Sequence, residues 1–246
     1  MKNAKYTAIV LSAGSGSRMH SEIPKQYMDL CGYPVIYYSL KVFGESPVDD
    51  IILVTGAQDL EFCRRDIVEK YGFSKVKAVV AGGSERYLSV YEGLKAASES
   101  DYVLIHDGAR PLIDADAIQR SMDTVEKDMA CVLAVPVKDT IKIADGNGFA
   151  DTTPDRSRLW AVQTPQSFSA ALLKEAYQKM FAAKADGKVL PAITDDAMLV
   201  EQMTSCRVRL VEGNYTNLKI TTPEDLLIAQ AFLESRKNLE KSEITA

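Results

Sequence analysis

The segment Tyr6–Met19, YTAIVLSAGSGSRM, runs from apolar residues straight into a turn of small residues that contains Gly14 and Gly16. Small-residue turns after a strand let backbone N–H groups approach phosphate oxygens closely. Met19 stands where a dinucleotide-binding fingerprint needs its third glycine, and the P-loop pattern fails at the same place. The turn is therefore a candidate phosphate site of another kind, although the same glycines also suit an ordinary strand-to-helix turn.

Two cations follow this turn. Arg18 comes directly after it, and Lys25 stands behind Pro24 in the segment EIPKQY. Together the turn, the arginine and the lysine predict a pocket for several negative charges, without the pattern of a hydride-transfer cofactor site. The expected nucleotide contacts in this part of the chain are Ala13, Gly14, Gly16, Arg18 and Lys25.

The motif HDGARP places a carboxylate, Asp107, directly after the apolar run 102–106. If that run is a strand of a parallel sheet, Asp107 lies at its carboxyl end, where such sheets bind ligands. Mg²⁺ binds triphosphates through one or two carboxylates together with phosphate oxygens and waters, and Asp107 is the best-placed carboxylate for it. An Asp-Gly turn without a ligand is the alternative. Arg110 in the same loop is expected to brace the site.

A second glycine loop, AGGSERYLSV at residues 81–90, leads into a predicted helix. The backbone at Gly83 and the hydroxyl of Ser89 are candidates for reading the edge of a base, with Arg86 supporting the loop. The alternative is a helix capped by Ser84, with Ser89 facing solvent.

Histidines are scarce for an enzyme that uses general acid–base catalysis, since the chain has only His20 and His106. A reaction whose nucleophile arrives already ionised needs no histidine base. A phosphate monoester, with its second pKa near 6, is such a nucleophile at neutral pH.

The hydrophobic pattern predicts the fold that must position these loops. Short apolar runs alternate with amphipathic stretches, which is typical of βα units that form a parallel sheet. The predicted strands are 6–12, 51–55, 76–82, 102–106, 130–137 and 207–213. The predicted helices are 35–43, 59–72, 85–98, 113–127, 169–184 and 223–241. We expect an α/β, Rossmann-like fold with a mostly parallel, doubly wound sheet, formed as a single domain over residues 1–246.

Residues 138–160, KDTIKIADGNGFADTTPDRSRLW, break this rhythm. The alternation in DTIKI and the turn signals DG and NG predict a β-hairpin with too little apolar surface for a core layer. An isolated two-stranded hairpin is marginal in water. We therefore expect a protruding arm that rests on a second copy of the chain, with an ordinary surface hairpin as the alternative.

The composition excludes several classes of protein. The chain has 246 residues with a net charge of −5 and a pI near 5.2, so it lacks the basic face that a general nucleic-acid binder needs. No stretch approaches the length of a membrane span. The four cysteines are scattered without metal-ligand spacing, and free thiols are typical of a cytoplasmic protein.

Beyond these patterns, LSAGSGSRM with PKQY resembles the start of nucleotidyltransferases that join a nucleoside triphosphate to a sugar or polyol phosphate. Downstream, the chain is similar to the 2-C-methyl-D-erythritol 4-phosphate cytidylyltransferases of the non-mevalonate isoprenoid pathway. The matching segments are AGGSERYLSV, HDGARP, VPVKDTIK, DRSRLWAVQTPQSF, ITDDAM and NLKITTPEDL. They follow one another over nearly the whole chain, up to the charged tail from about Ser235.

The resemblance implies roles for residues that the bare sequence does not single out. It places cytosine at the loop of Gly83 and Ser89, with Asp107 near the metal and the ribose. It directs Lys219, which we expect on a short strand before the helix 223–241, at the phosphates that are joined. It gives Thr164 and Thr194, the expected N-cap of a helix, contacts with the acceptor phosphate. The remaining acceptor contacts, Thr140 and Arg156, would come from the arm of a second subunit across a homodimer interface, with Arg158 as the alternative to Arg156.

The reaction that the resemblance implies is transfer of a cytidylyl group from CTP to a polyol phosphate, with Mg²⁺ or another divalent cation as cofactor. Arg18, Lys25 and Lys219 would be the catalytic cations, and Arg110 a further substrate-binding residue. A ribitol 5-phosphate cytidylyltransferase shares several of these motifs and is the nearest alternative. An NAD-dependent oxidoreductase and an inactive nucleotide-binding protein are distant ones.

Overall fold

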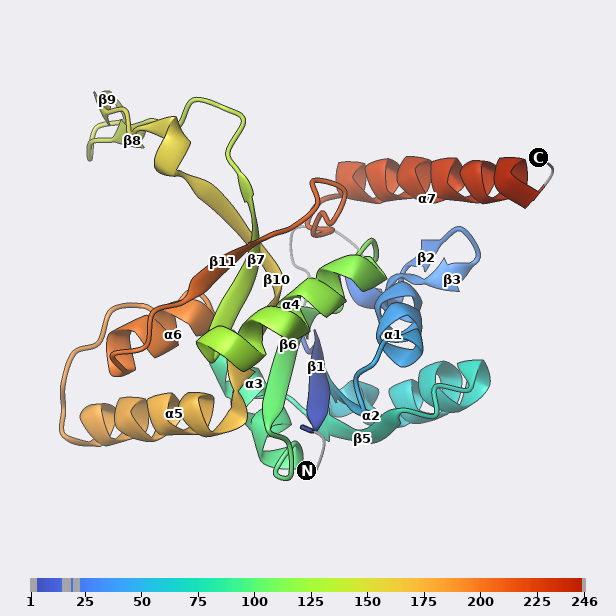
Figure 1. The fold of residues 1–246 in the computed structure, drawn as a ribbon, viewed down its shortest axis with the longest axis horizontal. Coiled ribbons are helices and arrows are strands. Elements are labelled where there is room, and N and C mark those ends of the chain that lie inside the picture. The colour runs from blue at the N-terminus through green and yellow to red at the C-terminus, as the bar shows by residue number, and fades with distance from the viewer. Residues whose placement is uncertain (1–3, 15–18, 20–22, 245–246) are drawn as a thin grey trace.

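The computed structural model describes residues 4–14, 19 and 23–244. Within these ranges seven strands form one sheet in the order β11-β7-β10-β6-β1-β4-β5, flanked by helices (Figure 1). The strands are β1 (Tyr6–Ser12), β4 (Asp50–Thr55), β5 (Val76–Ala81), β6 (Tyr102–Asp107), β7 (Ala130–Pro136), β10 (Trp160–Ser169) and β11 (Arg209–Glu212). Six of these strands run in one direction, and β10 runs antiparallel to β6 and β7. The expected α/β fold with a mostly parallel sheet is confirmed.

The helices divide into two layers because the strands β1, β4, β6 and β7 bury both of their faces. In β1, the side chains of Ala8 and Val10 join one core cluster, and that of Ile9 joins the other. The first cluster lies under α1 (Val35–Glu45), α4 (Ala115–Asp128) and the π-helical segment Cys63–Glu69 that follows α2 (Leu60–Phe62). The second lies under α3 (Arg86–Ala96), α5 (Ala170–Ala185) and α6 (Asp196–Met203). The expected doubly wound arrangement is therefore present.

The helix α3 lies very close to the sheet. A Cβ built on Gly93 of α3 would lie 2.5 Å from Cγ2 of Ile9 and 3.0 Å from Cγ2 of Val54. Only glycine permits this approach, since real Cβ atoms do not come so close to a branched side chain. The close packing sets the height of α3 above β1 and β4, and with it the position of the loop that precedes the helix.

The carboxyl ends of the parallel strands lie at one edge of the sheet. At this edge β1 separates β4 from β6, so the crossover connections leave β1 on opposite sides. Such a switch point opens a crevice outside the strand ends, which is where open α/β sheets bind ligands. The glycine turn follows β1, the Gly82–Gly83 loop follows β5, and Asp107 ends β6. The fold thus gathers three of the predicted loops in one place.

Four expectations about local structure are wrong or incomplete. The polar segment after the arm forms β10, a strand that the apolar pattern did not predict. The helix expected over 59–72 changes to π-helical geometry at Cys63. The N-cap of α6 is Asp195, whose side chain accepts a hydrogen bond from Met198 N, rather than Thr194. Lys219 lies in an irregular segment ahead of α7 (Pro223–Ile244) and not on a strand.

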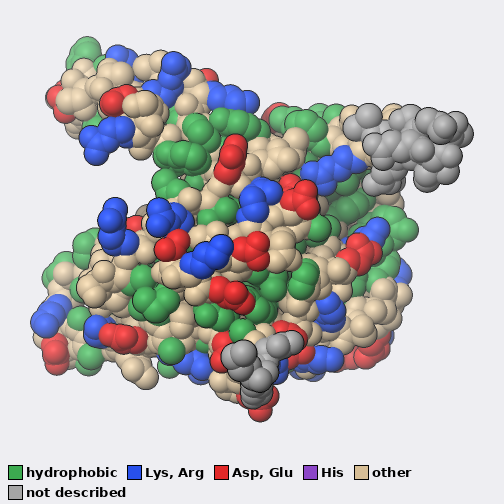
Figure 2. Space-filling view, in the orientation of Figure 1, with side chains coloured by type: hydrophobic (Ala, Val, Ile, Leu, Met, Phe, Trp, Pro, Cys, Tyr) green, Lys and Arg blue, Asp and Glu red, His purple; other side chains and the backbone are tan. Residues whose placement is uncertain are grey.

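The segment expected as an arm contains a two-stranded antiparallel ladder, β8 (Ile143–Ala144) with β9 (Ala150–Thr152). This ladder stands away from the central sheet, on the opposite side from the free end of α7 (Figure 1). Its residues are almost all exposed, including the large apolar side chains of Ile141, Ile143 and Phe149. In the space-filling view the arm is separated from the body by a hollow, and further hydrophobic side chains gather at its base (Figure 2). That the arm mediates assembly stays a prediction.

Two smaller elements complete the described chain. A short hairpin of β2 (Asp29–Leu30) and β3 (Tyr33–Pro34) packs with α7 in a third core cluster that includes Leu30, Ile220 and Leu233. Within the described ranges, no helix is both long and apolar enough to cross a bilayer. All four cysteines are free thiols.

Candidate active site

A cavity of about 440 Å³ opens at the carboxyl edge of the sheet, between the turn after β1, the loop before α3 and the end of β6. It brings together eight of the predicted site residues, which are far apart in the sequence. These are Ala13, Gly14, Lys25, Gly83, Arg86, Ser89, Asp107 and Lys219. Gly16 and Arg18 lie outside the described residues, so their expected nucleotide contacts stay predictions.

The carboxylate of Asp107 is the electrostatic centre of this cavity. Lys219 Nζ lies 2.8 Å from Oδ2, Arg86 Nε lies 3.5 Å from Oδ1, and Arg110 Nε lies 3.9 Å from Oδ2. Burial by itself raises the pKa of Asp107, but the charges of Arg86, Lys219 and Arg110 outweigh burial and hold the pKa well below its usual range. Asp107 is therefore ionised at neutral pH and has three cations beside it, one of which, Arg86, also pairs with Asp196. The excess positive charge suits a polyanionic ligand.

The segment that carries Lys219 is bound tightly to the loop after β6. Ile220 N donates to the carbonyl oxygen of Ala109 at 2.8 Å, and Arg110 Nη1 donates to the carbonyl oxygen of Asn217 at 2.7 Å. Arg110 therefore braces the site, as the sequence predicted. These bonds fix the backbone on both sides of Lys219, and its side chain, about one-third exposed, faces the cavity.

The start of the glycine turn is bound by Gln26, a residue that the sequence analysis did not single out. Gln26 is buried, and its Nε2 donates to the carbonyl oxygens of Ser12 at 2.7 Å and Gly14 at 3.2 Å. Because Gln26 occupies these two carbonyls, it fixes the backbone of Ser12 and Gly14 where the turn begins. The neighbouring Lys25 lines the cavity from the same short helical turn, Lys25–Tyr27. The PKQ motif was the available signal, since Gln26 directly follows the predicted lysine.

The loop before α3 is shaped by Ser89. This residue is buried, and its Oγ accepts a hydrogen bond from Gly83 N at 3.1 Å and lies 3.2 Å from the carbonyl oxygen of Glu85. A Cβ on Gly82 would lie 2.6 Å from Ser89 Oγ and 2.7 Å from the Cβ of Ala13, so the two glycine loops touch. The alternative in which Ser84 caps the helix and Ser89 faces solvent is wrong, because α3 begins at Arg86 after Glu85.

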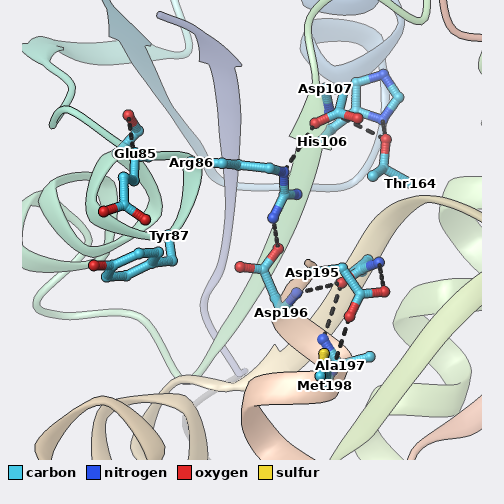
Figure 3. Close-up of polar contacts among 12 residues, drawn as sticks. Glu85, Arg86, Tyr87, His106, Asp107, Thr164, Asp195, Asp196, Ala197 and Met198 are labelled. Carbon is cyan, nitrogen blue, oxygen red and sulfur yellow. Dashed lines mark hydrogen bonds and ion pairs between the residues drawn. The ribbon is translucent and has the colours of Figure 1, made fainter. Parts of the chain in front are cut away.

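Arg86 connects two carboxylates, one of which the sequence reading missed (Figure 3). Its Nη1 lies 2.8 Å from Oδ2 of Asp196, the first residue of α6, while its Nε faces Asp107. Burial lowers the pKa of Arg86, but Asp196 and Asp107 outweigh burial and raise it. The side chain of Asp196 is buried, and burial is the main reason that its pKa is raised. ITDDAM marked this region, but nothing in the sequence pairs Asp196 with Arg86.

The first turn of α6 is held in place by Gln166 of β10. Gln166 Oε1 accepts from the backbone N–H groups of Asp196 at 3.0 Å and Ala197 at 3.1 Å, while its Nε2 donates to Asp195 at 3.0 Å. One buried amide thus satisfies three groups at the helix start. It also fixes where Asp196 stands relative to the cavity.

His106 and Thr164 form a buried hydrogen-bonded chain beneath Asp107. His106 Nε2 lies 3.2 Å from the carbonyl oxygen of Arg110, which only accepts, so Nε2 carries the proton. Nδ1 then accepts from the Thr164 hydroxyl at 3.0 Å, and the hydroxyl oxygen accepts from Asp107 N at 3.1 Å. The Thr164 hydroxyl is occupied by these two partners and does not line the cavity. Thr164 therefore positions the backbone of Asp107, and its expected contact with the acceptor stays a prediction.

Burial lowers the pKa of His106 to about 4. An unfolded chain binds a proton on this imidazole below pH 6.5, whereas the folded protein excludes that proton until the pH approaches 4. We therefore expect the contribution of neutral His106 to the free energy of unfolding to be fully present above pH 6.5 and to be lost as the pH falls toward 4. The loss is on the order of 3 kcal/mol, at about 1.4 kcal/mol per pH unit.

Urea unfolding of the wild type and of His106→Gln from pH 7.5 to 4 tests this expectation. Glutamine does not titrate, so the variant should be less stable at pH 7.5 but should lose less stability on acidification. Identical slopes of the free energy of unfolding against pH in both proteins would show that His106 is not the group responsible.

Three predicted acceptor contacts lie away from the cavity of their own chain. Thr140 and Arg156 belong to the exposed arm, where Arg156 Nη1 donates to the carbonyl oxygen of Lys138 at 3.0 Å. Arg158 is exposed on the same helical turn as Arg156. Thr194 is exposed beside α6, and its hydroxyl lies 3.4 Å from the sulfur of Met198. Among the described residues, one chain therefore brings the predicted nucleotide residues together with Lys219, but not with Thr140, Arg156 or Thr194.

A divalent cation fits this cavity only if the substrate supplies most of its ligands. In the described part of the chain, no group of three or more histidine, cysteine, aspartate and glutamate side chains could hold a metal ion. Asp107 offers one ionised carboxylate on the wall of the cavity, which matches the way Mg²⁺ binds with a triphosphate. The three neighbouring cations disfavour a metal bound before the nucleotide.

Comparison with known proteins shows the family to which the chain belongs. The family profile described as 2-C-methyl-D-erythritol 4-phosphate cytidylyltransferase matches residues 6–235. The chain belongs to this family. The protein of that name from Lachnospira eligens is 52% identical over 229 residues, which cover 93% of this chain and 99% of that protein. The one from Lachnoclostridium phytofermentans is 50% identical over 234 residues, covering 95% of this chain and 98% of the relative.

Solved structures of cytidylyltransferases share the fold. The crystal structure of 4-diphosphocytidyl-2C-methyl-D-erythritol synthase from Anaerococcus prevotii is 34% identical and aligns with a TM-score of 0.80, covering 94% of this chain and 99% of that one. The enzyme from Thermus thermophilus aligns with a TM-score of 0.72 at 29% identity, over 93% of this chain and 98% of that one. The expected enzyme class, a nucleotidyltransferase with cytidylyltransferase activity, is confirmed.

Proposed function

We propose that this cytidylyltransferase transfers the cytidylyl group of CTP to 2-C-methyl-D-erythritol 4-phosphate and releases pyrophosphate, with a divalent cation and with acceptor contacts from a second subunit. The observation that carries the proposal is that Gly14, Lys25, Asp107 and Lys219 line one cavity, in which Lys219 pairs with Asp107. Family membership supports the choice of nucleotide and acceptor.

In this proposal the two glycine loops hold the nucleotide. Backbone N–H groups at Ala13 and Gly14 bind the triphosphate, together with Gly16 and Arg18. The loop of Gly83, whose backbone N–H donates to Ser89, binds the cytosine. Backbone groups of this loop give specificity for the base. Asp107 contacts the ribose and the metal ion. The ion, when bound, neutralises negative charge on the phosphates.

The chemical step is an in-line attack by an oxygen of the acceptor phosphate on the α-phosphorus of CTP. The new bond is P–O, and the bond to the pyrophosphate oxygen breaks with its electron pair. Two polyanions must meet, and each uncompensated like-charge contact at about 4 Å costs roughly 4 kcal/mol at an effective dielectric of about 20. Lys25, Arg18 and Lys219 offset this repulsion, so catalysis consists of positioning and charge stabilisation.

The acceptor half of the site is proposed to come from the arm of a second subunit. Thr140 and Arg156 are exposed on the arm, before and after the ladder of β8 and β9, which stands away from the central sheet (Figure 1). The arm carries Lys and Arg side chains suited to a phosphate (Figure 2). Exposed apolar side chains of Trp160, Val162 and Tyr215 lie on β10 and just beyond β11, where they would be covered in a homodimer.

A matrix of substrates tests the proposed function. Pyrophosphate release is measured with each of CTP, UTP, ATP and GTP against methylerythritol phosphate and ribitol 5-phosphate, with and without EDTA. We expect turnover to require CTP, the methylerythritol acceptor and the metal ion. Faster turnover of ribitol 5-phosphate would show that it, and not methylerythritol phosphate, is the acceptor. CTP binding without any turnover would overturn the proposal.

A further inference from the structure

Asp196 is an unusual residue to find in the interior of this protein. It is the first residue of α6, and its side chain is about 1% exposed. One of its oxygens, Oδ2, accepts from Arg86 at 2.8 Å. Within the described residues the other, Oδ1, is buried without any hydrogen-bond partner. An unsatisfied buried oxygen lowers stability, so the carboxylate is not explained by its contribution to folding.

Geometry indicates what the carboxylate does to Arg86. The guanidinium lies between two carboxylates, with the shorter contact, 2.8 Å, to Asp196 and the longer, 3.5 Å, to Asp107 (Figure 3). Asp107 already has Lys219 at 2.8 Å. Without the charge of Asp196, the remaining carboxylate that faces Arg86 is Asp107. Arg86 would then move toward Asp107 and compete with Lys219 for it.

The backbone of Asp196 is held in place by contacts at the start of α6. Gln166 fixes the backbone N–H of Asp196, and Asp195 caps the helix through Met198 N at 2.8 Å. These contacts hold the α-carbon of Asp196 independently of Arg86. The carboxylate is therefore fixed in place, and the side chain of Arg86, the first residue of α3, is the group that it positions.

We propose that Asp196 is a positioning residue that holds the guanidinium of Arg86 at its long, 3.5 Å contact with Asp107 Oδ1, so that Oδ2 keeps its 2.8 Å contact with Lys219 beside the nucleotide. Asp196 lies behind Arg86 and does not line the cavity, so it acts through the arginine and not on the substrate. The inference rests on the proposed function, because the step it supports is turnover of CTP. It also links α6, beside the predicted acceptor residue Thr194, to the nucleotide loop.

A double-mutant cycle tests the proposal. Asp196→Asn, Arg86→Gln and the double variant are compared with the wild type by pyrophosphate release, with kcat and KM for CTP measured separately. Asparagine keeps the shape of Asp196 and removes its charge. We expect kcat of Asp196→Asn to fall roughly 10- to 100-fold while KM for CTP changes less than about threefold. The double variant should be no slower than Arg86→Gln alone.

Glu201→Gln is the matched control, since Glu201 is an exposed carboxylate on the same helix and does not line the cavity. It should keep wild-type kcat. Losses that multiply in the double variant would show that Asp196 acts independently of Arg86, and an unchanged kcat in Asp196→Asn would also overturn the proposal. A wild type that does not turn over CTP would instead refute the proposed function, so the two failures are distinguishable.

Discussion

Lys219→Met is expected to lower kcat on the order of 1,000-fold, with little change in the fold. The ammonium lies 2.8 Å from Asp107 and faces the cavity, so it is placed to stabilise negative charge that develops on the phosphates. Methionine keeps the length and the apolar stem of lysine but not its charge. Arg86 and Arg110 remain beside Asp107, so the carboxylate is not left without a counter-ion.

Initial rates of pyrophosphate release at saturating CTP and acceptor give kcat, and thermal unfolding monitors the fold. Lys179→Met is the control, because Lys179 forms an exposed ion pair with Glu175 on α5, outside the cavity. It undergoes the same substitution and loses the same type of contact, yet it should keep wild-type turnover. A Lys219→Met protein that keeps more than half of the wild-type kcat would remove Lys219 from the mechanism.

Mixing two inactive variants is expected to restore activity. Arg156→Ala removes the proposed acceptor contact of the arm, and Lys219→Met removes the catalytic cation of the cavity. If each site combines the cavity of one chain with the arm of the other, a mixed dimer contains one intact site and one with both defects. Equal amounts with free subunit exchange should recover about one quarter of wild-type turnover.

The recovery must follow subunit exchange, so activity is measured over time after mixing and compared with each variant alone. Replacing Arg156→Ala by Arg158→Ala in the same mixture decides which arginine of the helical turn Arg156–Arg158 contacts the acceptor. If the Lys219→Met and Arg156→Ala proteins stay inactive after exchange, the arm does not supply Arg156 to a neighbouring site.

The sequence predicted the scaffold well because the scaffold follows the apolar pattern. β1, β4, β6 and β7 are almost wholly buried, so their side chains are apolar on both faces and read as continuous runs. The strand β10 escaped this reading because it buries polar groups. Gln163, Thr164, Gln166 and Ser167 are all buried, and the roles of the first three become visible only when their hydrogen-bond partners are known.

The residues of the candidate site that could be predicted are those that belong to recognisable sequence motifs. Each of these motifs lies at the carboxyl end of a strand: the glycine turn after β1, the loop of Gly83 after β5 and Asp107 at the end of β6. Because these ends lie at one edge of the sheet, the fold brings the motifs together. The pairing of Arg86 with Asp196 joins residues 110 positions apart and leaves no local signal. Sequence reasoning also missed Gln26, whose contacts are to backbone carbonyls of another loop and depend on the folded turn.

The long separation of Lys219 from Asp107 in the sequence has a consequence during synthesis. The glycine turn, the loop of Gly83 and Asp107 all precede residue 110, whereas the cation that pairs with Asp107 leaves the ribosome long after them. Its backbone is then fastened to the loop after β6 by Ile220 and Asn217. A nascent chain that has not yet reached Lys219 therefore lacks the cation that pairs with Asp107, and we expect no turnover from it.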